Sequence, residues 1–103
     1  MDRMKKLQEF LLTNPDDPFI KHAMALEYIK LGVDSIARPL LEEVLEKDPA
    51  SMGSYYQLGK LLERTGETAL ALQWYEKGMA AARTAGEKRA YNELQAAYDD
   101  LAG

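Results

Sequence analysis

Residues 52–85 read MGSYYQLGKLLERTGETALALQWYEKGMAAARTA, and this stretch decides the fold. Its apolar residues recur every three or four positions on both sides of Gly66, which is the spacing of two amphipathic helices separated by a turn. The preceding residues, 18–51, repeat the pattern, with Gly32 standing one repeat before Gly66. A fixed period of about 34 residues predicts an array of helix pairs, because neighbouring pairs bury apolar faces that one pair alone leaves open.

The two stretches agree at the positions that we expect to be buried. Shifting the sequence by one repeat superimposes Ala37 on Ala71. The other matched pairs are Met24 with Leu58, Tyr28 with Leu62, Ile36 with Leu70, Leu40 with Trp74, Leu41 with Tyr75, Glu42 with Glu76 and Leu45 with Met79. Small residues also meet, Ala25 with Gly59, and we expect them to let paired helices approach closely.

This pattern resembles the tetratricopeptide repeat family, whose unit is a helix-turn-helix of about 34 residues. The residues that carry the resemblance are Met24, Ala25, Tyr28, Gly32, Ala37 and Pro49 in the first unit, and Tyr55, Leu58, Gly59, Gly66, Ala71 and Tyr75 in the second. The resemblance implies an all-α fold, a right-handed α-solenoid of about six helices. We expect a single domain, 1–103, with an N-terminal helix over 1–14, repeats over 18–51 and 52–85, and a C-terminal capping helix over 86–103.

Turn residues indicate where the helices begin. Asp17 before Pro18 is typical of an N-cap followed by proline at the first helical position. Asp34 is expected to cap the next helix in the same way. Pro39 lies inside that helix and predicts a local kink or a delayed start, because its ring removes one hydrogen bond of the helix.

Composition narrows the possible functions. The 103 residues include 13 basic and 17 acidic ones, a net charge of −4, and lack the basic face that nucleic-acid binding requires. There is no cysteine, and His22 is the one histidine, so thiolate and histidine metal sites are not expected. No nucleophile, base and orienting group occur together. We therefore expect a protein that is not an enzyme and that carries no metal or cofactor.

The N-terminal sequence does not predict a membrane segment. The apolar run that follows Lys5 and Lys6 is short, contains Glu9 and ends at Asn14 and Pro15. A membrane-spanning helix needs about 20 apolar residues. We therefore expect no signal peptide and no membrane binding, and a cytoplasmic location is compatible with the sequence.

The resemblance also implies a concave groove, lined by the first helix of each pair, that holds an extended peptide or a partner helix. The residues that it places in this groove are Phe19, His22, Leu26 and Ile29 from the first repeat, Tyr56, Gln57 and Lys60 from the second, and Arg89, Asn92 and Ala96 from the capping helix. Apolar and cationic side chains are mixed in this set, which favours an acidic and hydrophobic peptide. We therefore expect a protein–protein interaction scaffold.

Two alternatives stay open. In the first, so short an array has a shallow groove, and the groove residues only complete the helix packing. In the second, apolar residues at the ends of the array, around Met4, Phe10 and Phe19, join copies into a homodimer that has no dedicated peptide ligand. Binding of a chaperone's C-terminal carboxylate is not expected, because Leu26 offers no hydrogen bond and Glu93 would repel a carboxylate.

Overall fold

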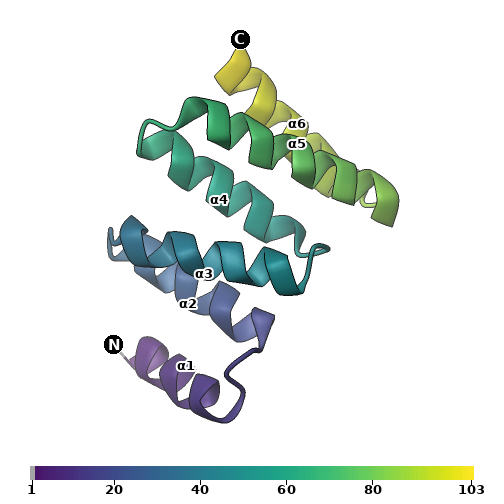
Figure 1. Ribbon diagram of the computed structural model, residues 1–103. Coiled ribbons are helices and arrows are strands. Elements are labelled where there is room, and N and C mark those ends of the chain that lie inside the picture. The colour runs from purple at the N-terminus through teal and green to yellow at the C-terminus, as the bar shows by residue number, and fades with distance from the viewer. Residues whose placement is uncertain (1) are drawn as a thin grey trace. The chain divides into compact units, whose positions relative to one another are not determined.

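The computed structural model describes residues 2–103, which form six α-helices and no strand (Figure 1). The helices are α1 (Asp2–Thr13), α2 (Pro18–Lys30), α3 (Asp34–Lys47), α4 (Met52–Arg64), α5 (Thr68–Ala85) and α6 (Lys88–Ala102). They belong to two compact units whose boundary falls between Asp48 and Pro49. The N-terminal unit contains α1 to α3, and the C-terminal unit contains α4 to α6. The all-helical fold expected from the sequence is confirmed.

Three glycines end helices in the same way. Gly32, Gly66 and Gly86 have φ angles of 77°, 82° and 72°, in the left-handed region where other residues are strained. After each glycine, the next backbone N–H donates to the carbonyl five residues earlier: Val33 to Tyr28, Glu67 to Leu62 and Glu87 to Ala82, each at 2.9 Å. The turns after α2 and α4, one in each repeat, therefore have the same backbone hydrogen bond at equivalent positions.

The start of α2 agrees with the sequence prediction, whereas the start of α3 does not. The Asp17 carboxylate caps α2 by accepting the backbone N–H of Phe19 at 2.9 Å and that of Ile20 at 3.4 Å. In α3 the cap position is Val33, without a side-chain hydrogen bond, and Asp34 is the first helical residue. The predicted cap is therefore wrong, although a carboxylate in the first turn is favoured by the helix dipole.

Pro39 lies inside α3, which begins at Asp34, so the start of the helix is not delayed; the alternative expectation, a local kink, stays a prediction. Proline removes one backbone hydrogen bond from the helix. The apolar face of α3 offsets this loss, because Ala37, Leu41 and Val44 are at most 1 % exposed. Burial of a leucine or valine side chain contributes about 1.5–3 kcal/mol.

The core of the N-terminal unit lies around α2, which packs against α1 and α3. Its buried cluster consists of Leu7, Ile20, Ala23 and Met24, with Met4, Leu11, Tyr28 and Leu40 packed against it. Arg3 of α1 also reaches Glu27 of α2, with 3.1 Å between Nε and Oε2. The large apolar side chains of Phe10, Leu12 and Phe19 stay outside this core, with exposed fractions of 56 %, 84 % and 80 %.

In the C-terminal unit, α5 packs against both α4 and α6, and glycines permit the close approach. A Cβ on Gly59 would overlap the ring of Tyr75, and one on Gly78 would lie 2.7 Å from the Cβ of Tyr55. Tyr75 is fully buried, and its hydroxyl donates a hydrogen bond to the carboxylate of Glu63. The expected role of Gly59 in close packing is therefore confirmed.

Candidate functional site

A hollow of about 360 Å³ lies between α4 and α6 and is called the α4–α6 hollow below. Its lining residues are Tyr56 and Lys60 from α4, and Glu93, Ala96, Ala97 and Asp100 from α6. The four α6 residues follow the spacing i, i+3, i+4 and i+7, which places them on one face of the helix. The small alanine side chains leave space between the charged residues, so a ligand side chain can enter.

The lysine of the α4–α6 hollow is paired within α4. The Nζ of Lys60 lies 3.7 Å from Oε2 of Glu63 and 5.7 Å from the centroid of the Tyr56 ring. Glu63 also accepts the hydrogen bond of Tyr75. Burial, reinforced by the Glu63 carboxylate, raises the pKa of the Tyr75 phenol far above its usual value, so this phenol stays a donor. The charge of Lys60 is therefore balanced by a carboxylate that does not line the hollow.

The two carboxylates of the α4–α6 hollow have no comparable partner. Glu93 and Asp100 are exposed. Within the described residues, neither side chain forms an ion pair or a hydrogen bond. The hollow therefore combines an aromatic ring with two uncompensated negative charges.

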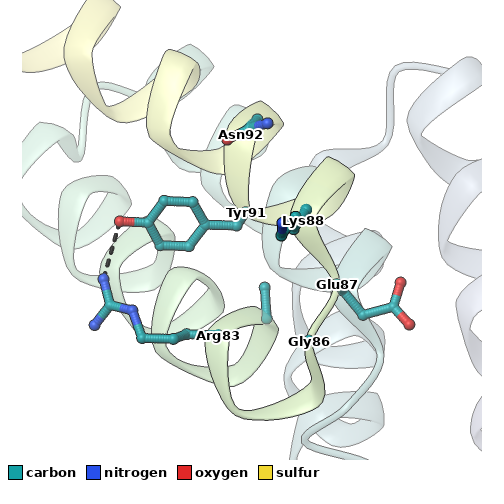
Figure 2. A pocket seen from close by; sticks show the side chains of 7 residues that line it. Arg83, Gly86, Glu87, Lys88, Tyr91 and Asn92 are labelled. Carbon is teal, nitrogen blue, oxygen red and sulfur yellow. Dashed lines mark hydrogen bonds between the residues drawn. The ribbon is translucent and has the colours of Figure 1, made fainter.

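A second hollow, of about 380 Å³, lies where α5 ends and α6 begins and is called the corner hollow. Figure 2 shows Arg83 and Tyr91 on one side of it, joined by a hydrogen bond of 2.9 Å from Nη2 to the phenolic oxygen. The carboxylate of Glu87 points away from Arg83 in this view (Figure 2). The other lining residues are Ala82, Gly86, Lys88 and Asn92. The corner hollow is thus lined by two cations, Arg83 and Lys88, and one carboxylate, whereas the α4–α6 hollow is lined by one cation and two carboxylates.

The structure brings together part of the predicted groove set of the C-terminal unit. Tyr56, Lys60 and Ala96 line the α4–α6 hollow, whereas Asn92 lines the corner hollow. The two that line neither hollow are Gln57, half-buried on α4, and Arg89, exposed on α6. The part that any of these residues plays in binding stays a prediction.

The other four predicted groove residues lie on α2 in the N-terminal unit. Phe19 is exposed, and the half-buried ones are His22, Leu26 and Ile29. Burial lowers the pKa of His22 below its usual value of 6.5, which favours the neutral imidazole at physiological pH. His22 therefore adds little positive charge to this part of α2.

Ala97 and Asp100 were not assigned to the site by sequence reasoning, and Glu93 was considered there only as a residue that would repel a chaperone's carboxylate. A signal for them exists, because they share one helical face with the predicted residue Ala96. Their inclusion matters for charge, since they bring two carboxylates to a surface that was expected to suit an acidic peptide.

Neither a metal cluster nor a membrane helix occurs in the part of the chain that the structure describes. No three His, Asp or Glu side chains gather closely enough to hold a metal ion. No helix is both long enough and apolar enough to cross a membrane.

Comparison with known sequences identifies the class of protein. Residues 40–73 match the family described as tetratricopeptide repeat. A TPR repeat-containing protein of Pseudomonas aeruginosa is 30 % identical over 88 residues, which cover 85 % of this chain and 84 % of that protein. The chain therefore belongs to the tetratricopeptide repeat family. The stacked helices of this fold form surfaces for protein–protein interaction.

Solved structures agree with this assignment. A tetratricopeptide repeat domain protein of Salinibacter ruber is 41 % identical with a TM-score of 0.80, covering 84 % of this chain and 98 % of its own. A protein of Bordetella parapertussis is 29 % identical with a TM-score of 0.83, covering 96 % of this chain and 86 % of its own. The TPR2B domain of yeast Sti1, in a complex with pHsp70, shares the fold at 19 % identity, with a TM-score of 0.88 and coverage of 96 % and 79 %.

Proposed function

We propose that this chain binds a short segment of a partner protein in the α4–α6 hollow. The observation that carries the proposal is the convergence of three predicted groove residues, Tyr56, Lys60 and Ala96, around one hollow. Its volume of about 360 Å³ lies near the lower end of ligand pockets, which span roughly 300–1,000 Å³. Such a size suits a few side chains of an extended peptide or of one face of a helix.

The walls of the α4–α6 hollow are held by buried packing. Leu58 of α4 and Leu94 of α6 are at most 1 % exposed, and Ala97 at the hollow itself is 4 % exposed. A wall that is already ordered lowers the entropy cost of binding, because fewer protein side chains must be fixed when the ligand arrives.

A solved structure of the same fold supports a protein ligand. The TPR2B domain of yeast Sti1 was determined in a complex with pHsp70. A domain of this architecture therefore associates with another protein, and the same class of ligand is proposed for this chain. The carboxylates at the α4–α6 hollow give no reason to extend the likeness to the identity of the partner.

The experiment fills the α4–α6 hollow with a larger side chain. A partner is first identified by affinity capture from the native source, and its dissociation constant is measured by calorimetry. Ala96→Phe should weaken binding at least about tenfold, since the ring occupies the space of a ligand side chain. The matched control is Ala69→Phe, because Ala69 is exposed on α5 and lines none of the hollows described above.

The control should bind like the unchanged protein, and circular dichroism should show the same helix content for both variants. Equal affinity of Ala96→Phe and the unchanged protein would contradict the proposal.

A second candidate function is self-association through the N-terminal unit. Exposed fractions of 56 % for Phe10, 84 % for Leu12 and 80 % for Phe19 favour it, because a second copy that covered these side chains would remove apolar surface from water. Met4, named with them from the sequence, instead packs against the core cluster. Light scattering over a range of concentrations tests this candidate: a dimer that Phe19→Ser dissociates supports it, and a monomer throughout rejects it.

A further inference from the structure

We infer that the partner segment presents a basic side chain, arginine or lysine, to the α4–α6 hollow. This inference rests on the proposed function and specifies the chemistry of its ligand. It departs from the acidic peptide that the sequence favours. The predicted groove set contains two cations, Lys60 and Arg89, and no carboxylate, whereas the hollow is lined by Lys60 and by the carboxylates of Glu93 and Asp100.

The first step concerns Lys60, the one cation among the lining residues. Its ammonium lies 3.7 Å from the Glu63 carboxylate, and Glu63 is itself fixed by the hydrogen bond from the fully buried Tyr75. A lysine held in this way offers its aliphatic stem to the hollow, while its charge is already balanced. An incoming carboxylate would share Lys60 with Glu63, so it would gain less from this ion pair than from an unpaired lysine.

The second step concerns the charges that remain. Glu93 and Asp100 stand seven residues apart, two turns along the same face of α6, and no described side chain pairs with either. A cation between them is attracted by both carboxylates, whereas an anion is repelled by both. Exposed ion pairs each change affinity by about two- to threefold, so two of them together change it by about five- to tenfold.

The third step concerns Tyr56, whose ring forms the aromatic wall. Cations bind the face of such a ring when they lie within about 6 Å of its centroid. Lys60 lies near that limit, at 5.7 Å. A guanidinium seated in the hollow and closer to the ring gains more, because its planar group also stacks on the aromatic face.

The test uses two peptides that differ in one residue. They are acetyl-Ala-Leu-Arg-Leu-Ala-amide and the same peptide with glutamate in place of arginine, each titrated into the isotope-labelled full chain. Backbone amide shifts are followed by nuclear magnetic resonance. The arginine peptide should shift the amides of Lys60, Ala96 and Ala97, and it should bind more tightly than the glutamate peptide.

Two double variants that remove the same number of negative charges test which carboxylates bind the arginine peptide. Glu93→Gln combined with Asp100→Asn should weaken binding of the arginine peptide about five- to tenfold. The matched control combines Glu76→Gln with Asp99→Asn, two exposed residues outside the hollow, and should change affinity less than about twofold. A similar loss in both double variants would overturn the assignment, since only the overall charge would then matter.

The outcomes separate this inference from the proposed function. Binding of the glutamate peptide to the same amides, as tightly as the arginine peptide or more so, overturns the basic ligand and leaves the binding site in place. If neither peptide shifts these amides, the inference fails, and the effect of Ala96→Phe on the native partner decides the proposed function separately.

Discussion

Gly59→Ala should destabilise the C-terminal unit, although alanine is the better helix former. The new Cβ would lie 2.6 Å from Cζ and 2.7 Å from Cδ1 of the Tyr75 ring, and closer still to Cε1. Tyr75 cannot move freely, because it is fully buried and its hydroxyl is bonded to Glu63. The substitution must therefore separate α4 from α5 or tilt the ring.

The magnitude follows from two opposing terms. Overpacking a buried contact costs up to about 3 kcal/mol. Replacing glycine by alanine inside a helix returns about 1 kcal/mol. The expected net loss is up to about 2 kcal/mol, which for a domain of this size lowers the melting temperature by at most roughly 8–16 °C.

Thermal unfolding of Gly59→Ala can be followed by fluorescence of Trp74, the one tryptophan, which packs against Tyr55 in the same unit. Gly53→Ala is the control, since Gly53 is exposed in the first turn of α4 and should show little change. A melting temperature of Gly59→Ala equal to or above that of the unchanged protein would refute the packing argument.

Other substitutions test the helix ends and the titration of the N-terminal unit. Asp17→Ala removes the two hydrogen bonds that cap α2 and should lower the free energy of unfolding, measured in urea, by about 1 kcal/mol. The control Asp16→Ala should lower it far less, and equal losses in the two variants would argue against the cap. Gly66→Ala places a side chain at φ 82° and should cost about 1–2 kcal/mol, so an unchanged unfolding midpoint would contradict a strained turn. Burial lowers the pKa of His22, so the unfolded chain binds the proton more readily and stability should fall as pH drops from about 7.5 to about 5.5. His22→Gln should flatten that profile, and an equal slope in both proteins would exclude His22 as the cause.

The repeat and its turns could be predicted because their causes are local. Gly32 and Gly66 adopt a conformation that glycine favours, and Asp17 reaches backbone N–H groups two and three residues away. Asp34 was predicted wrongly for an equally local reason. The residue after the glycine, Val33, uses its N–H in the turn and its carbonyl to accept the N–H of Ala37 at 3.3 Å, so backbone bonds set the start of α3.

The charge of the α4–α6 hollow was harder to predict, because it depends on which carboxylate pairs with Lys60. Glu63 lies three residues along α4, a separation at which helix side chains interact, so this pair can be read from the sequence. The nearness of Glu93 to Tyr56 cannot, since it depends on how closely α4, α5 and α6 pack. The distance between α4 and α5 is set in part by Gly59, whose missing side chain makes room for the buried ring of Tyr75.

The most direct measurement concerns the side chain that occupies the α4–α6 hollow. The full chain, isotope-labelled, is combined with the unlabelled arginine peptide, and intermolecular nuclear Overhauser effects are recorded. The account predicts contacts from the arginine side-chain protons to the Tyr56 ring and to the methyl groups of Ala96 and Ala97. Contacts confined to the corner hollow, or to the N-terminal unit, would contradict it.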